Sequence, residues 1–394
     1  MAANTSGHPT HFHEGMTTMS KMSMHDYDTF RETMRRLALD KVAPHAAEVD
    51  RTKSPPKQAF AAFRDAGVLG LPFAEDLGGQ DADLLSQVIA VEEMARVCAT
   101  SALCLMTGWA ALDPLVRFGS PKLISEIVRP VAAGKLIAAW CLTEPQGGSD
   151  MQAIKTHAER KGDGWVINGT KRFITNASWA DWYLVLARTG EKAHGIFMVH
   201  RDDPGISFGK LEAKMGLRGS PTADVIFDNC EIPASRAVGD SNKGYEHMIV
   251  SLTISRPLIA AQALGIAQGA LDEAVKYTRD RKQFGQSVSR FQLVRGMIAD
   301  MALKVESSRS LLYRAVEAIE TDPQQGRTLA SMAKLLCSDT AMAVTTDAVQ
   351  LHGGYGYLED YPVERMMRDA KITQIYEGTN QIQRLIIAKS VYGD

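Results

Sequence analysis

The sequence has few cysteines and almost no charge imbalance, and both features limit what it can be. Only five cysteines are spread over 394 residues, with no CxxC pair and no ligand-like spacing to histidine. Neither a disulfide scaffold nor a zinc site is therefore expected, and the thiols should be reduced and mostly buried. The 44 Lys and Arg residues nearly balance the 46 Asp and Glu residues, giving a formal net charge of -2. Since no overall positive field attracts nucleic acid or an anionic membrane, we expect neither as a partner.

Membrane and targeting signals are also missing from the sequence. No uninterrupted apolar run approaches the roughly 18 residues that span a bilayer, and the first arginine is Arg31, unlike an Arg-rich transit peptide. We expect a soluble, cytoplasmic protein. Residues 1–24 lack periodicity and favour a mobile leader. The histidines at positions 8, 11 and 13 could bind a metal, but a flexible segment lacks the rigid ligand geometry required, so we assign no metal site.

The apolar pattern divides the remaining chain into three parts. Helical spacing dominates residues 25–135, and short β-rich runs separated by Gly, Asp, Asn and Pro turns dominate residues 136–243. No long helix interrupts those runs, so they should pair mainly antiparallel in a barrel or sandwich. Helical spacing returns in residues 244–394, where one continuous apolar face comprises Val294, Ile298, Met301, Val305, Ser308, Leu312, Ala315 and Ile319. The pattern predicts an α+β multi-domain fold that ends in a helix bundle.

A strand that runs into a glycine-rich turn is the first candidate site. It extends from Cys141 to Asp150 and contains Gly147 and Gly148. Paired glycines let backbone N–H groups approach a ligand, and the hydroxyls of Thr143 and Ser149 add donors. By itself, the pattern fits an ordinary β-turn equally well.

A second candidate lies in the segment from Lys171 to Ala177. Strand alternation would place Phe173 and Thr175 on one face, where an aromatic plane and a hydroxyl suit a flat heteroaromatic ring. A half-buried structural strand remains the alternative.

A third candidate is the glycine-rich run from His352 to Tyr357. A dinucleotide-binding glycine motif should follow a strand, whereas this run follows a helical stretch, so a Rossmann interpretation fails. The glycines fit either a helix end or a close backbone approach to a diphosphate.

The fourth candidate is the segment from Tyr376 to Gln383, just before the last expected helix. An acidic residue just before a helix usually does no more than interact favourably with the helix dipole. Glu377, however, is followed by Gly378, and that flexible residue could aim the carboxylate into a cleft. Thr379 and Gln381 could then face a ligand at the helix N-terminus.

These motifs, in this order, resemble the acyl-CoA dehydrogenase family over nearly the whole chain, from about Asp26 to Tyr392. The resemblance also rests on the Arg281-Lys282-Gln283-Phe284-Gly285 motif and on the segment from Tyr361 to Lys371. It implies an N-terminal helical domain, a central antiparallel β-barrel or sandwich and a C-terminal four-helix bundle. It also implies a homotetramer, or sometimes a dimer, with FAD at a subunit interface.

The resemblance assigns cofactor contacts by motif position. The flavin ring is expected against Leu142, Thr143, Phe173 and Thr175, with Ser149 as a flavin or pantetheine contact. Further cofactor contacts from a neighbouring subunit are expected at Arg281, Gln283, Phe284, Gln292, Gln350, Gly353 and Gly354. Thr379 and Gln381 would also contact the cofactor.

The resemblance also assigns the chemistry. Glu377 would remove the α-proton of an acyl-CoA thioester while the β-hydrogen leaves as hydride to flavin N5. The Glu377 N–H and an FAD hydroxyl would stabilise the enolate oxygen. Substrate contacts are expected at Tyr376, Gly378 and Arg256. Some relatives carry the base at the position occupied here by Ser255, but serine cannot serve as that base unaided.

Substrate and acceptor are less closely constrained. Met106 and Thr107, with Trp109 nearby, would occupy the pocket floor and favour a short, branched or compact acyl group, unless they are core residues. Electrons are expected to pass to electron-transfer flavoprotein. An oxidase, decarboxylating or β-eliminating variant is the alternative, and a DNA-binding member is disfavoured by the charge balance.

Overall fold

The structure, a computed structural model, describes residues 22–393. Most of the predicted leader, including its three histidines, lies outside these residues. The last position of that leader is wrong, because Met24 already begins the first helix. Ser23 caps this helix by accepting a hydrogen bond from the Asp26 N–H, and the Asp26 carboxylate accepts from the Ser23 N–H.

Within residues 22–135, six α-helices joined in places by short 3₁₀ and π turns form the first part of the fold. Polar side chains set several of their starts: Asp83 accepts from the Ser86 N–H, and Ser120 accepts from the Leu123 N–H. The helices are α1 (Met24–Leu37), α2 (Ala46–Thr52), α3 (Lys57–Asp65), α4 (Leu84–Ala95), α5 (Ala99–Phe118) and α6 (Pro121–Ala132).

The middle of the chain forms one eight-stranded sheet. Seven of its strands follow the order β6-β7-β3-β2-β4-β5-β8, and the eighth, β1, pairs with β4. Its pairing is mainly antiparallel, as predicted, but β1–β4 and β2–β4 are parallel. The sequence did not reveal these because β1 reaches β4 over a long excursion. The strands are β1 (Ala138–Cys141), β2 (His157–Lys161), β3 (Gly164–Thr175), β4 (Trp182–Arg188), β5 (His194–His200), β6 (Ile206–Phe208), β7 (Thr222–Pro233) and β8 (Ala237–Val238).

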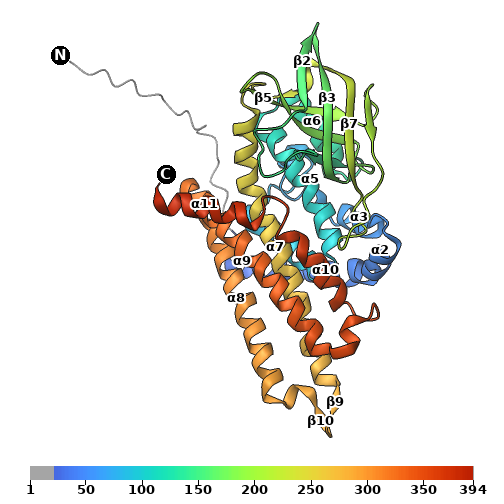
Figure 1. Cartoon of the computed structure of the whole chain (residues 1–394), viewed down its shortest axis with the longest axis vertical. Helices are drawn as coiled ribbons and strands as arrows, with labels where there is room; N and C mark the ends of the chain where they lie inside the picture. The colour runs from blue at the N-terminus through green and yellow to red at the C-terminus, as the bar shows by residue number, and fades with distance from the viewer. Residues whose placement is uncertain (1–21, 394) are drawn as a thin grey trace, which may run out of the picture.

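The last part is a helix bundle, and the predicted fold class is confirmed. Figure 1 shows α7 running from the β-strands at the top of the molecule to the small β9–β10 hairpin at the bottom, beside α8, α9 and α10, with α11 across the upper end of α9. The predicted apolar face of residues 294–319 lies on α8, and its central members are buried. The elements are α7 (Gly244–Asp280), β9 (Lys282–Gln283), β10 (Gln286–Ser287), α8 (Gln292–Thr321), α9 (Pro323–His352), α10 (Val363–Thr373) and α11 (Asn380–Tyr392).

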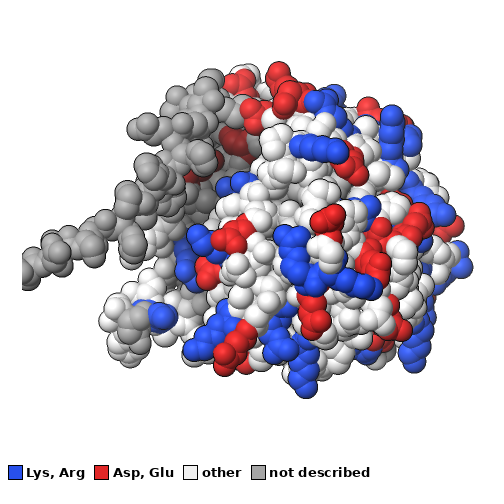
Figure 2. Space-filling view, turned by 90° about the horizontal axis from the view of Figure 1, so that it is seen from above, with Lys and Arg blue, Asp and Glu red and all other residues white. Residues whose placement is uncertain are grey.

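Two helices are long and apolar enough to be compared with membrane spans. By length and composition alone, α5 and α7 could cross a membrane, although neither contains an uninterrupted apolar run. Their most apolar windows are 83% and 78% buried inside the fold, which is ordinary for core helices of a soluble protein. On the face seen in Figure 2, Lys and Arg side chains are interspersed with Asp and Glu.

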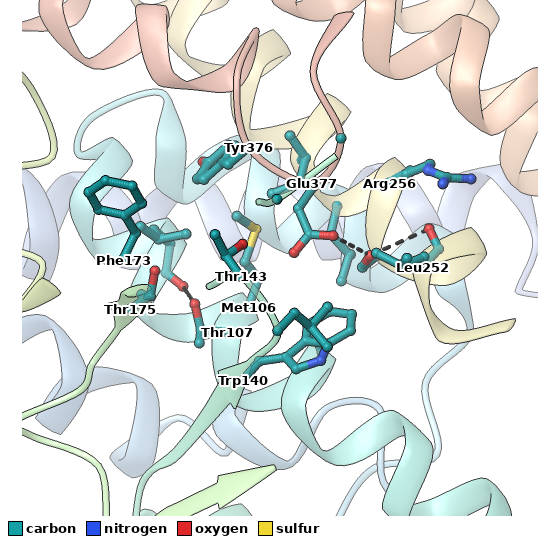
Figure 3. A pocket seen from close by; sticks show the side chains of 18 of the residues that line it. Met106, Thr107, Trp140, Thr143, Phe173, Thr175, Leu252, Arg256, Tyr376 and Glu377 are labelled. Atoms are coloured by element: carbon teal, nitrogen blue, oxygen red, sulfur yellow. Dashed lines mark hydrogen bonds between the residues drawn. The ribbon is translucent and has the colours of Figure 1, made fainter. Parts of the chain in front are cut away.

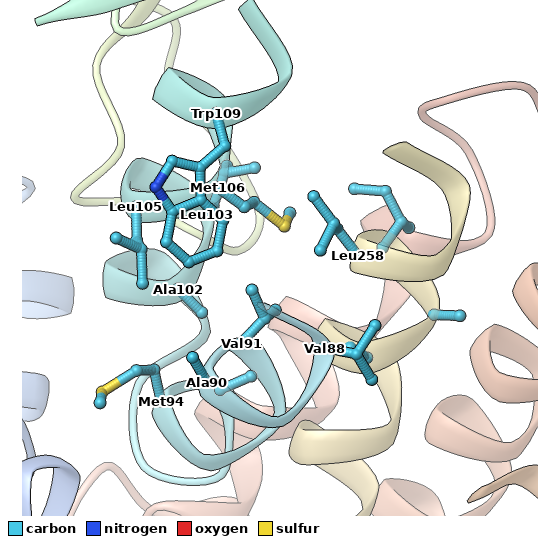
Figure 4. Close-up of a cluster of buried hydrophobic side chains, with 14 of the residues drawn as sticks. Val88, Ala90, Val91, Met94, Ala102, Leu103, Leu105, Met106, Trp109 and Leu258 are labelled. Atoms are coloured by element: carbon cyan, nitrogen blue, oxygen red, sulfur yellow. The ribbon is translucent and has the colours of Figure 1, made fainter. Parts of the chain in front are cut away.

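The N-terminal helices and the bundle share one hydrophobic core. Figure 4 shows Val91 and Met94 of α4 packed near Leu103 and Met106 of α5, with Leu258 of α7 close by. Helices α4 and α7 approach so closely at Gly265 that the backbone of one helix contacts the backbone of the other. A Cβ at Gly265 would lie 2.2 Å from the carbonyl oxygen of Glu92. The contact fixes α7, and therefore the residues that α7 contributes to the site described below.

We predict that Gly265→Ala lowers the free energy of unfolding by about 1–3 kcal/mol, because the added methyl group overpacks the α4–α7 contact. Gly296→Ala on α8 is the matched control. Nothing lies within 4 Å of a Cβ at Gly296, so the better helix propensity of alanine should leave stability unchanged or raise it. Urea unfolding followed by circular dichroism measures both. Equal stability of the two variants would contradict the packing argument.

Candidate functional site

A cavity of about 200 Å³ lies where the β-sheet, α5, α7 and the loop before α11 meet. Figure 3 shows the Glu377 carboxylate pointing into it, with Phe173 and Thr175 on one side and Trp140 on another. Its lining is Leu103, Met106, Thr107, Ala110, Trp140, Leu142, Thr143, Gly148, Ser149, Met151, Phe173, Ile174, Thr175, Leu252, Ser255, Arg256, Leu258, Ile259, Tyr376, Glu377, Gly378 and Ile382. The cavity thus joins candidate residues from three separate sequence motifs.

The β-sheet contributes a turn and a strand end to the cavity. After β1 the chain folds back so that the backbones of Glu144 and Gly147 exchange hydrogen bonds of 3.1 Å. Near its end β3 changes register between Lys171 and Ile174, and Phe173 has a left-handed φ of 59°. This irregularity replaces the simple alternation expected from the sequence. It leaves the Phe173 ring 58% exposed at the cavity.

A buried ion pair supports these two segments from behind. The Lys171 ammonium lies 2.8 Å from Oε1 of Glu144, and the two side chains are 0% and 1% exposed. Glu144 also accepts hydrogen bonds from the backbone N–H groups of Lys155 and Thr156. Although burial opposes it, the pair with Lys171 and these hydrogen bonds lower the pKa of Glu144 to about 2. The β1 turn is thereby fixed to β3.

Glu377 lies in the loop between α10 and α11, in an unusual backbone conformation. Glu377 and Gly378 have left-handed φ values of 54° and 87°. This geometry turns the carboxylate into the cavity, where the Ser255 hydroxyl donates to Oε2 at 2.9 Å. The Glu377 N–H donates to none of the residues between 22 and 393. Thr379 then caps α11 by accepting from the Ile382 N–H.

Burial raises the pKa of Glu377, while the Ser255 hydrogen bond and the charges of Arg256 and Lys334 oppose that rise. Because its pKa is raised, this carboxylate is a stronger base than a carboxylate in water. Arg256 is itself 4% exposed, and its Nε and Nη1 atoms have no hydrogen-bond partner among the described residues. Burial lowers the pKa of Arg256 to about 10, against the attraction of Glu377. Tyr376 donates its hydroxyl to Gln262.

The structure separates the helix α5 residues that the sequence left ambiguous. Met106 and Thr107 line the cavity, and the Thr107 hydroxyl donates its hydrogen bond to the Leu103 carbonyl. Trp109 is core, because it is buried and its indole N–H donates to the Leu69 carbonyl at 2.9 Å. The cavity floor is therefore almost entirely apolar.

The remaining predicted cofactor residues do not line the cavity. Arg281, Gln283 and Phe284 lie at the end of α7 and in the β9–β10 hairpin, and the Phe284 side chain is 93% exposed. This region is at the lower end of Figure 1, far from the β-sheet. Gln292 begins α8, while Gln350, Gly353 and Gly354 lie at the end of α9, where the Arg281 guanidinium covers the nearby Tyr355 ring. Thr379 and Gln381 lie at the start of α11, and neither lines the cavity. Action on a neighbouring subunit's cofactor stays a prediction.

Sequence reasoning missed several residues of the site. The sequence indicates Ser255 only as the position of an alternative base, whereas in the structure it hydrogen-bonds to Glu377. No sequence pattern indicates Lys334, although its ammonium donates to the Gly378 carbonyl at 2.8 Å. Leu252, Ile259 and Ile382 gave no signal, because an apolar cavity wall has the same helical spacing as a core.

Comparisons with known proteins agree along the whole chain. Family models for the N-terminal, middle and C-terminal domains of acyl-CoA dehydrogenase match residues 24–135, 139–230 and 242–392. The chain is 45% identical over 370 residues to a probable acyl-CoA dehydrogenase of Mycobacterium tuberculosis, covering 93% of this chain and 95% of that protein. It is 44% identical to a cyclohexane-1-carbonyl-CoA dehydrogenase of Geobacter metallireducens, covering 91% and 96%.

Solved structures show the same similarity. Butyryl-CoA dehydrogenase from Megasphaera elsdenii superimposes with a TM-score of 0.90 at 36% identity, covering 95% of this chain and 100% of that one. A chain from a structure described as the electron transferring flavoprotein of Acidaminococcus fermentans superimposes with a TM-score of 0.91 at 40% identity, with coverage of 95% and 100%.

Proposed function

The chain belongs to the acyl-CoA dehydrogenase family, and on that premise we propose that it oxidises an acyl-CoA thioester to the trans-2-enoyl-CoA with Glu377 as the base. The observation that carries this proposal is the Glu377 carboxylate, which is directed into an apolar cavity and accepts a hydrogen bond from Ser255. A desolvated carboxylate of raised pKa is suited to remove a proton from the carbon beside a thioester. The neighbouring N–H of Glu377 is free to donate to the thioester oxygen as charge develops there.

The cavity also fits the flavin that the family uses. The exposed Phe173 ring offers a flat surface, Thr143 and Thr175 offer hydroxyls, and Gly148 leaves room beside Thr143. We therefore propose that Leu142, Thr143, Ser149, Phe173 and Thr175 hold the ring of FAD. When bound, FAD would accept the β-hydrogen of the substrate as hydride.

The second group of predicted cofactor residues implies an assembly. The residues of the β9–β10 hairpin and of the α9 end lie too far along the bundle to serve the cavity of their own chain. We propose that they complete the FAD site of a neighbouring subunit in a homotetramer or a dimer. Electron-transfer flavoprotein is the proposed electron acceptor.

The proposed substrate carries a compact, uncharged acyl group. Leu103, Met106 and Leu258 supply apolar walls, and within residues 22–393 Arg256 and Glu377 are the charged residues of the lining. A relative at 44% identity is named for a cyclohexane-1-carbonyl substrate, and a similar structure is that of a butyryl-CoA dehydrogenase. The charge of Arg256 already faces Glu377, so a second carboxylate on the acyl chain would be buried with no further cation to compensate it, which is costly.

We expect butyryl-CoA and cyclohexane-1-carbonyl-CoA to bleach the flavin of the purified protein faster than palmitoyl-CoA or glutaryl-CoA. The preference should be at least about 10-fold, the lower end of what a single poorly fitting methylene contributes. Anaerobic stopped-flow absorbance measures the rates. Product identification distinguishes simple dehydrogenation from decarboxylation or elimination, and oxygen consumption in parallel aerobic reactions reveals oxidase activity. Fastest reduction by glutaryl-CoA would contradict the proposed pocket chemistry.

A further inference from the structure

Lys334 is a fully buried lysine in the middle of α9. Its side chain is 0% exposed, and its ammonium donates to the Gly378 carbonyl at 2.8 Å and to the Asn380 side-chain oxygen at 2.9 Å. Among residues 22–393 it forms no ion pair. Buried lysines are rare unless a carboxylate compensates them, so a lysine held only by neutral oxygens calls for a reason.

The ammonium contacts the loop that carries Glu377. The Gln383 side-chain amide donates to the carbonyls of Glu377 and Gly378 at 3.2 and 2.9 Å, so the Gly378 carbonyl accepts from two donors. Together these bonds hold two successive residues in the left-handed region. For Glu377, such a conformation costs about 1–3 kcal/mol and persists only where the surroundings enforce it. Lys334 is therefore part of what aims the carboxylate into the cavity.

The charge of Lys334 also acts on that carboxylate. Glu377 is surrounded by Ser255 and Arg256 from α7, by Lys334 from α9 and by Tyr376 of its own loop. Burial is the main influence on the pKa of Lys334 and lowers it to about 7, against the attraction of Glu377 and Asp339, while Arg256 adds repulsion. The positive charges of Arg256 and Lys334, on α7 and α9, thus oppose the rise that burial causes in the pKa of Glu377.

We propose that Lys334 is a positioning residue for the Glu377 base, whose ammonium fixes the Glu377–Gly378 turn from behind and favours the ionised form of the carboxylate. The inference rests on the proposed function of Glu377. It assigns to a bundle residue that does not line the cavity a direct influence on the proton-transfer step.

The FAD-loaded variants Lys334→Met and Lys334→Gln test this proposal. Methionine removes the charge and the donors, whereas glutamine keeps a donor for the Gly378 carbonyl. Neither variant leaves the loop oxygens without a hydrogen-bond donor. Gln383 still donates to the Gly378 carbonyl, and Ser338 still donates to the Asn380 side-chain oxygen. Loss of a nearby positive charge should move the acid limb of the kcat/KM profile upward by on the order of one pH unit in both variants. Lys334→Met should also have the lower kcat.

Lys214→Met is the control, since Lys214 is a half-buried lysine that also donates to a backbone carbonyl, that of Ser220, at 2.6 Å. Its acid limb should coincide with that of the wild type. Thermal unfolding should show little loss for Lys334→Met, because an apolar replacement removes the cost of desolvating the ammonium. An acid limb at the wild-type pH in either Lys334 variant overturns the proposal. If Glu377→Gln keeps full activity, it is the proposed function itself that fails.

Discussion

Glu377→Gln should reduce flavin bleaching by acyl-CoA by about 100- to 10,000-fold, the usual contribution of a positioned general base. An amide of nearly the same shape keeps an oxygen that can accept from Ser255, but it cannot take up the α-proton at neutral pH. The cofactor-holding residues on the β-sheet side are unchanged, so the purified variant should keep its FAD and its yellow colour. Anaerobic stopped-flow absorbance with butyryl-CoA separates the two effects.

The controls for this variant follow from its surroundings. Glu231→Gln, at an exposed position of strand β7, should bleach at the wild-type rate. In the wild type, activity should fall as pH decreases through the raised pKa of Glu377, because the protonated carboxyl cannot act as a base. Ser255→Ala removes a hydrogen bond that lowers this pKa, and it should move the acid limb to higher pH. Wild-type bleaching rates in Glu377→Gln would exclude Glu377 as the base.

Lys171→Met should lower the free energy of unfolding at neutral pH by about 3–5 kcal/mol, because it leaves the Glu144 carboxylate buried without its cation. The side chains of the pair are 0% and 1% exposed, and Lys171 also donates to the Leu142 carbonyl at 3.2 Å. The loss should be greatest where Glu144 is ionised and should shrink as the pH falls and the carboxyl is protonated. Chemical unfolding at about pH 7 and about pH 5 measures this difference.

The wild type has the opposite dependence on pH. The folded-state pKa of Glu144 lies near 2, below its ordinary value of 4.5, so its stabilising contribution is complete above that ordinary value and is lost as the pH falls toward 2. Lys161→Met is the matched control on the same sheet. Lys161 and Glu231 are 2.7 Å apart, close to the 2.8 Å of the buried pair, but their side chains are 69% and 58% exposed, so about 0–1 kcal/mol is expected. Equal losses in the two lysine variants would contradict the role assigned to burial.

The sequence predicted those parts of the fold in which one face of an element is buried. The face of α8 that runs from Val294 to Ile319 was recognisable because its spacing alternates between four and three residues. The β-rich runs of the sequence include residues 165–168 and 172–175, which the structure joins into the one strand β3 across Gly169, a residue with a φ of 144° at a register shift. No β-rich run covers residues 157–161, which form β2, since they are mostly polar and exposed.

The sequence predicted some residues of the candidate site and not others. Glu377, Thr143 and Phe173 could be found because they occur in local motifs whose residue types suggest chemistry. Lys334 could not be found, because it meets Gly378 only through packing of α9 against a loop that follows 44 residues later. Nor could the sequence separate Met106 from Trp109, since cavity wall and core differ only in the rotation of α5.

The most direct test of Glu377 as the base is exchange of the α-hydrogen of butyryl-CoA with heavy water on the FAD-loaded protein under anaerobic conditions, followed by mass spectrometry. The wild type should exchange this hydrogen, and Glu377→Gln should do so about 100- to 10,000-fold more slowly while its FAD stays bound. Equal exchange rates in the two proteins would show that another group removes the proton.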